Sequence, residues 1–193
     1  LTMDVFVWMI SFSVLNAGLQ SQYGLTLENL AYFQIWFNLS NMVFQIPAGK
    51  LTDKIGKKKM LIVSQIAGLV IFGLYIVIDI CWSLGNVNIL FPLIIIIQIV
   101  FGISVTTFIP SESMMMTDLD ETRKGESYGV VSFIRGFGAI PTGVIGGFLI
   151  ARVHFIAPFT LTLVGIVFEI FLVLKYGNVF EEDKDKEVLE EKL

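Results

Sequence analysis

The stretch Gly49-Lys50-Leu51-Thr52-Asp53-Lys54-Ile55-Gly56-Lys57-Lys58-Lys59 separates two long apolar runs of the chain. The run before it is Leu30–Ala48, and the run after it is Met60–Trp82. Glycine tolerates close backbone approach and a positive φ, so the two glycines favour a tight turn. Asp53 is the only anion among five lysines, and a generic basic loop would not need it there. The stretch therefore predicts a specialised turn between two membrane-spanning segments.

Six apolar stretches of this kind follow one another along the chain. They are Met3–Leu19, Leu30–Ala48, Met60–Trp82, Val87–Met116, Tyr128–Ala151 and Phe155–Leu174. A helix needs about 20 apolar residues to span a bilayer, and long runs without alternation match helices rather than barrel strands. The sequence predicts an all-α membrane protein whose residues 1–176 form a bundle of six transmembrane helices. The expected spans lie at about 2–21, 29–49, 59–82, 87–117, 126–151 and 155–176.

The composition agrees with this class and excludes several others. Of the 193 residues, 55% are hydrophobic and 16% are charged, whereas soluble domains have about 25% charged residues. One cysteine and one histidine, Cys81 and His154, cannot build a Cys/His metal site or a catalytic triad. Nothing basic and aromatic suggests nucleic acid. We expect a protein of the lipid bilayer that is not an enzyme and has no cofactor, metal or nucleic-acid partner.

Charge is concentrated at the end of the sequence. Residues 177–193 contain three lysines and seven carboxylates, so this segment carries the whole net charge of −4. We expect an acidic cytoplasmic tail that is solvated. A partner-binding role for the tail is the alternative.

The cations predict the orientation in the membrane. Of the 13 lysines and arginines, eleven fall on one face of the expected bundle, Arg152 falls on the other, and Arg135 lies within a span. The positive-inside rule places the lysine-rich face in the cytoplasm. We therefore expect a multi-pass protein of the cell (plasma) membrane with both termini cytoplasmic.

Two prolines lie in the interior of expected spans. Pro110 and Pro141 should bend the fourth and fifth helices, because proline removes a backbone donor and neighbours can satisfy the freed carbonyl in a bundle. Each bend is either a static kink or a gating hinge, and the sequence is compatible with both.

The turn between the second and third spans resembles the signature loop of the major facilitator superfamily, G-x-L-x-D-R-x-G-R-[RK]-[RK]. Lysines 54 and 57 stand where arginine is commoner. The residues that carry the likeness are Gly49, Leu51, Asp53, Gly56 and Lys57.

The loop between the fourth and fifth spans also resembles this family, with an acidic start at Asp118 and an Arg-x-Gly at Arg123. The resemblance implies a cytoplasmic gating motif in which Lys57 contacts Asp118. It also implies that Asp53 faces a helix of an opposing half. The residues alone indicate only that opposite charges share this face.

The family has two six-helix halves, and this chain supplies one. The C-terminal half is the better match, because Gln98 occupies the place of an arginine usual in the first half. The pattern Gly138–Gly147 also departs from the first half's Gly-Pro-x-x-Gly-Gly, and Leu1 is not an initiator methionine. We expect a C-terminal half or fragment whose partner is a missing N-terminal half or a second copy of the chain.

Three ionisable residues lie well inside expected spans, namely Glu112, Arg135 and Glu169. Each costs about 2.5–3.5 kcal/mol at a helix centre when it is unpaired. Glu112 and Arg135 lie at similar depth on consecutive helices and could pair, either as a packing salt bridge or as a site for substrate or a coupling proton. Glu169 favours a supporting role with a snorkelling side chain. Asp4 and Asp79 are expected near the interfaces.

Neutral polar residues on the first two spans are candidates for hydrogen bonds in a cavity, with interhelical contacts as the alternative. They are Asn16, Gln20, Asn38, Asn41 and Gln45. On the fifth span, small residues recur at intervals of four and predict close helix packing. They are Ala139, Gly143, Gly147 and Ala151.

The leading hypothesis for function is a secondary active transporter of a small solute that works by alternating access, coupled to an ion or a proton. A half-size carrier that assembles as a homodimer is the first alternative. A membrane scaffold or sensor that reuses the fold without transport is the second. The residues do not identify the substrate.

Overall fold

The computed structural model describes residues 2–117 and 123–176. All regular elements in this part of the chain are helices. They are α1 (Thr2–Tyr23), α2 (Leu27–Ile55), α3 (Lys57–Ser83), the 3-10 helix η1 (Val87–Ile89), α4 (Leu90–Thr117), α5 (Lys124–Ala139), α6 (Thr142–Arg152) and α7 (Ala157–Tyr176). The predicted all-α fold is confirmed.

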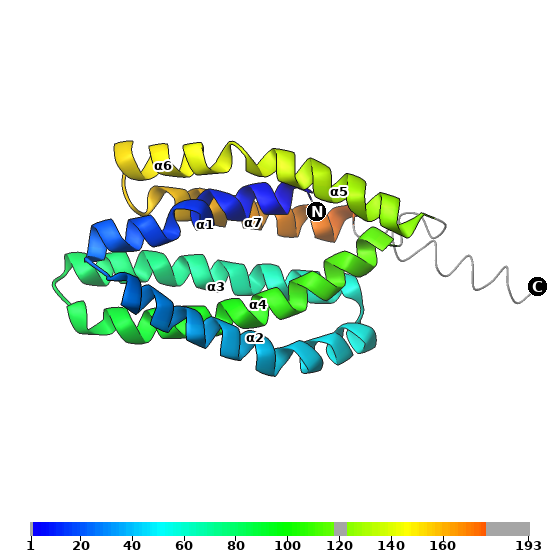
Figure 1. Cartoon of the computed structure of the whole chain (residues 1–193), viewed down its shortest axis with the longest axis horizontal. Coiled ribbons are helices and arrows are strands. Elements are labelled where there is room, and N and C mark those ends of the chain that lie inside the picture. Colours follow the sequence, from blue (N-terminus) through cyan, green and yellow to red (C-terminus); the bar gives the residue numbers. More distant parts are fainter. Residues whose placement is uncertain (1, 118–122, 177–193) are drawn as a thin grey trace, which may run out of the picture.

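The helices form six rods that run alternately up and down, with α5 and α6 lying end to end as one rod (Figure 1). The start of α1, the turn from α2 to α3 and the end of α7 lie at one end of the bundle. We call this the lysine-rich end, because the turn contains Lys50, Lys54 and Lys57–Lys59. The turns at Gly24 and Gly85 lie at the opposite end, which we call the glycine end.

By length and composition, five helical segments could cross a membrane. They are Met3–Tyr23, Lys57–Ser83, Val87–Met116, Gly125–Arg152 and Ala157–Lys175. Helix α2 is not among them, although it is 29 residues long. Its amides Gln34, Asn38, Asn41 and Gln45 interrupt the apolar run. Helix α2 lies along α4 in the same bundle, which is how a less apolar helix is accommodated among more apolar ones.

The turn between α2 and α3 is shorter than the sequence suggested. Helix α2 continues to Ile55, and α3 begins at Lys57, so Gly56 alone joins them. Gly56 has a φ of 90°, and its N–H donates to the carbonyl oxygen of Thr52 at 2.9 Å. Only glycine adopts this φ without strain. Gly49, in contrast, lies within α2, and no atom crowds the position of a Cβ there.

The two interior prolines have different effects. Pro141 divides the fifth rod, since α5 ends at Ala139 and α6 begins at Thr142. The N–H of Ile140 donates to the Phe137 carbonyl oxygen at 3.3 Å. Pro141 has no backbone N–H, so it cannot continue the helical hydrogen bonds. The Thr142 hydroxyl donates to the Ala139 carbonyl oxygen at 2.7 Å. Helix α4, in contrast, continues unbroken through Pro110.

The principal helix contacts follow a simple rule. Helix α2 packs on α4, and α1 packs on the rod formed by α5 and α6; α4 packs on α3, and α1 packs on α7; α3 also packs on α7. Exchanging the first three rods with the last three leaves this set of contacts unchanged. The bundle is therefore built from two three-rod repeats that enclose one core.

Aromatic rings fill that core between α1, α3, α4 and α7. Phe12 stacks on Phe101 with ring centroids 4.6 Å apart, and Tyr75 stacks on Phe159 at 5.1 Å. Offset and edge contacts of this kind stabilise a core beyond the burial of area alone. The rings fix α1 against α3 and α7, the helices that also carry the buried carboxyl groups of Asp4, Asp79 and Glu169.

Candidate functional site

The structure brings Glu112 of α4 and Arg135 of α5 together. An Nη1 atom of the guanidinium lies 2.7 Å from Oε2 of the carboxylate, and both side chains are largely buried. The second carboxylate oxygen, Oε1, is buried and accepts no hydrogen bond within the described part of the chain. Pairing neutralises two charges that would each be costly alone in the bilayer. Oε1 therefore keeps the capacity to accept a hydrogen bond from one further donor.

Glu169 does not snorkel, and Asp4, expected near an interface, is covered by other helices. Both are buried, with 5% and 8% of their surface exposed. Helix α7 packs on α3 and α1, and these neighbours cover Glu169 in a way that its position in the chain does not reveal. Asp4 of α1 and Glu169 of α7 line one cavity of about 60 Å³ together with Gln65 of α3.

Gln65 connects this pair to the aromatic core. The indole N–H of Trp8 donates to Oε1 of Gln65 at 3.3 Å, and Nε2 of Gln65 donates to Oδ1 of Asp4. An indole nitrogen can only donate, so this contact fixes which end of the amide faces Asp4. We call Asp4, Gln65 and Glu169 the inner carboxyl cluster. The sequence offered one signal for it, since Asp4 and Trp8 are four residues apart on one face of α1.

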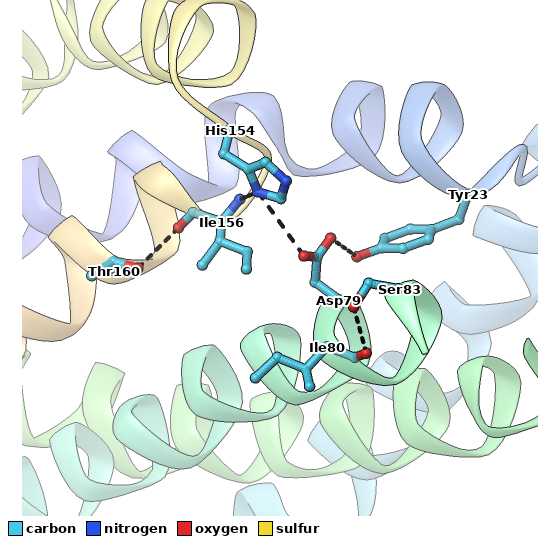
Figure 2. Close-up of polar contacts among 7 residues, drawn as sticks. All are labelled: Tyr23, Asp79, Ile80, Ser83, His154, Ile156 and Thr160. Carbon is cyan, nitrogen blue, oxygen red and sulfur yellow. Dashed lines mark hydrogen bonds and ion pairs between the residues drawn. The ribbon is translucent and has the colours of Figure 1, made fainter. Parts of the chain in front are cut away.

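A second buried carboxylate joins the same helices at the glycine end. Figure 2 shows Asp79 of α3 between Tyr23 of α1 and His154 of the loop before α7. The Tyr23 hydroxyl donates to Oδ1 of Asp79 at 3.0 Å, and Nδ1 of His154 lies 4.0 Å from Oδ2. Nδ1 also accepts the N–H of Ile156 at 3.4 Å. Asp79, expected near an interface, is buried at the glycine end, where it links α1 to α3.

The residues of the expected gating motif gather at the lysine-rich end. Leu51 and Asp53 are exposed, and Lys57 is half-buried where α3 begins. Asp118 lies outside the described residues, and so does the expected contact between Lys57 and Asp118. Arg123 pairs with Glu126 at 3.3 Å, with both side chains exposed, and exposed pairs of this kind stabilise a protein little.

The candidate cavity amides are not brought into one network. Nε2 of Gln34 donates to Oδ1 of Asn38 at 3.4 Å on the exposed side of α2. Asn16 and Gln45 are exposed, whereas Gln20 and Asn41 are half-buried. In the described part of the chain, no hydrogen bond joins the α1 amides to the α2 amides. Their role toward a solute remains a prediction.

The closest approach to the fifth rod is not on the expected stripe of small residues. A Cβ on Gly146 would lie 2.3 Å from the carbonyl oxygen of Ile10. The backbone of α1 therefore occupies the space that a side chain at position 146 of α6 would need. At Gly143 the nearest atom would be Cβ of Ser13 at 3.9 Å, and at Gly147 nothing lies within 4 Å. Ala139 is half-buried and Ala151 is exposed. The helix interface within this chain is thus offset from the stripe.

The comparison with protein families identifies the class of protein. The family model described as Major Facilitator Superfamily matches residues 1–192. Among curated proteins, none matches the chain. The chain belongs to the major facilitator superfamily, and the predicted family is confirmed. The two three-rod repeats agree with this, because each six-helix half of such transporters contains two inverted three-helix repeats.

The family defines the general properties of this protein. It is a multi-pass membrane protein of a transporter family, its surroundings are the lipid bilayer, and proteins of this family bind small-molecule substrates. The predicted arrangement of long apolar helices agrees with this class.

Proposed function

We propose that this chain forms one six-helix half of a secondary active transporter that moves a small solute by alternating access. The buried Glu112–Arg135 pair carries the proposal. It places a charged group with an unused acceptor, Oε1 of Glu112, between two helices of a membrane bundle. Intramembrane charges of this kind mark solute and ion pathways. A substrate with an N–H or O–H donor, or a proton, fits the unused oxygen.

The exposed face of α5 and α6 supports assembly with another bundle. Phe133, Phe137, Ile140 and Val144 on this rod are each at least 70% exposed. Apolar exposure alone would suit lipid, but Arg135 lies on the same rod and its charge would be costly beside lipid. We therefore place this rod against a second six-helix half, either an N-terminal half or a second copy of the chain.

The cytoplasmic location of the lysine-rich end belongs to this proposal. It is supported by the five lysines around Gly56 and the positive-inside rule. Cysteines introduced singly at Lys50 and at Leu84, which is 79% exposed at the glycine end, would report the orientation through an impermeant thiol reagent added to intact cells, in a Cys81→Ser background. We expect labelling at position 84 and protection at position 50, with the plasma membrane as the location. The reverse pattern would contradict the proposed orientation.

Uptake into proteoliposomes tests the transport function directly. The purified protein, reconstituted together with its second half or as the assembled dimer, is offered a panel of radiolabelled small solutes under an imposed proton gradient. We expect accumulation of at least one solute, and loss of that accumulation in Glu112→Gln with unchanged protein yield. The exposed carboxylate variant Glu28→Gln is the matched control and should transport normally. Unchanged uptake in Glu112→Gln would remove this residue from the mechanism.

A further inference from the structure

The inner carboxyl cluster is chemically incomplete. Both carboxylate oxygens of Glu169 are buried, and neither accepts a hydrogen bond within the described residues. The other polar side chains that line the same cavity are Asp4 and Gln65, and the Asp4 carboxylate is itself an acceptor when ionised. Two ionised carboxylates that share a buried site repel one another. Contact between them is favourable only when something positive lies between them.

The side-chain donor that lines the cavity among the described residues, the amide of Gln65, is already used. Its N–H group points to Asp4 and not to Glu169, because its oxygen faces the Trp8 indole. Within the described residues, Asp4 thus accepts one side-chain hydrogen bond, whereas Glu169 accepts none. The cavity of about 60 Å³ that these side chains line is otherwise bounded by apolar residues of α1, α3, α4 and α7. It offers no further oxygen ligands among the described residues.

Other charges close to the cluster do not complete it. The Glu112–Arg135 pair on α4 and α5 acts on Asp4 only electrostatically, and the Arg135 guanidinium is committed to Glu112 at 2.7 Å. The amino group of Leu1 lies outside the described residues. No other charged side chain from α1, α3, α4 or α7 lines this cavity.

We infer that Asp4 and Glu169, held by Gln65, form a proton-binding site. Glu169 takes up one proton from water, its new O–H donates to the Asp4 carboxylate, and Gln65 donates to Asp4 from α3. A metal cation fits less well, because hard cations such as Ca²⁺ take six to eight oxygen ligands. The described residues that line this cavity supply four carboxyl oxygens, and one of these already accepts a hydrogen bond from Gln65. Use of this proton as the coupling ion rests on the proposed transport function, but its binding does not.

Infrared spectroscopy can observe this proton without any substrate. The purified protein in lipid nanodiscs, at neutral pH in potassium buffer, should show the carbonyl stretch of a protonated carboxyl group, shifted on exchange into D₂O. We expect Glu169→Gln to lose this band, because the new amide N–H replaces the proton as donor to Asp4. The matched control Glu126→Gln, which changes an exposed carboxylate, should keep it.

A second variant and a change of salt test the proton site independently of Glu169→Gln. Asp4→Asn examines the site from the other helix and should also lose the band, since its amide donates to an ionised Glu169. Absence of the band in the unmodified protein, or its survival in both variants, overturns the proton site. Loss of the band on replacing potassium by sodium would make the occupant a metal cation. A band that behaves as expected in a protein whose uptake ignores the proton gradient supports the site and refutes only its coupling role.

Discussion

Helices α1 and α3 are linked by buried carboxyl groups at both ends of the bundle, and the two links are completed differently. At the glycine end, Asp79 receives a hydrogen bond from the Tyr23 hydroxyl, so the protein satisfies the carboxylate itself. At the lysine-rich end, Asp4 accepts a hydrogen bond from the amide of Gln65, but Glu169 accepts none from the part of the chain that the structure describes. A buried acceptor with a fixed donor is a structural link, whereas one without a donor is a place for a mobile ligand.

The largest effect is expected from Gln65→Leu. The substitution removes the donor to Asp4 and the acceptor for Trp8, so two buried polar groups lose their partners. Each unsatisfied group costs about 1–3 kcal/mol, and we expect the free energy of unfolding to fall by about 2–5 kcal/mol. Unfolding of the purified protein in mixed detergent, followed by near-UV circular dichroism, measures it. A loss close to zero would show that Gln65 does not hold the inner carboxyl cluster together.

Tyr23→Phe should have an intermediate effect. It leaves the ring contacts with Trp82 and Phe155 in place but removes the one hydroxyl that donates to buried Asp79. We expect a loss of about 1–3 kcal/mol in the same unfolding measurement. Adding Asp79→Asn to Tyr23→Phe should restore part of the loss, because the unsatisfied acceptor is then no longer charged. A double variant less stable than the single one would contradict this explanation.

Glu169→Gln should change stability by less than about 1 kcal/mol. Its amide can donate to Asp4, so the new side chain reproduces the hydrogen bond that the proton supplies. This sets it apart from Tyr23→Phe, although both residues are buried at a carboxyl link. A loss of unfolding free energy as large as that of Tyr23→Phe would mean that Glu169 stabilises the fold as Tyr23 does at the glycine end. The measurement is the same detergent unfolding, with Glu126→Gln as the exposed reference.

His154→Ala should have the smallest effect, below about 0.5 kcal/mol. The side chain is more than half exposed, and its Nδ1 lies 4.0 Å from Asp79. That nitrogen already accepts the Ile156 N–H, so it contributes little to the carboxylate in the neutral form. Thermal unfolding of the purified variant against the unmodified protein is the check. A larger loss would mean that the histidine, and not Tyr23 alone, completes the glycine-end link.

The pattern of residues predicted the helical rods well and the buried polar links poorly. Long apolar runs such as Met60–Trp82 can only be satisfied as helices in a bilayer, so their class follows from local composition. The Glu112–Arg135 pair could also be predicted from the sequence, because two opposite charges at similar depth on consecutive helices have few other partners. Asp4 and Glu169 are 165 positions apart in the chain, and nothing local reveals that α7 lies beside α1.

Helix boundaries could be predicted from local chemistry, whereas the packing surfaces of the helices could not. Pro141 breaks the fifth rod for a reason present in its own chemistry, and Gly56 permits the turn that its φ requires. The choice of Gly146 rather than Gly143 or Gly147 as the contact with α1 depends on how α6 is rotated about its axis. Rotation is fixed by packing across the whole interface, which a repeat of small residues does not specify.

The sequence by itself determined that this protein is an all-helical member of a membrane transporter family, because apolar length and the Gly49–Lys59 signature are local properties. Only the tertiary structure decided which buried carboxyl groups accept a hydrogen bond from the protein. Burial and hydrogen-bond partners are properties of the assembled helices. At one end the buried carboxylate of Asp79 accepts from Tyr23, whereas at the other the buried carboxyl group of Glu169 accepts no hydrogen bond within the described residues.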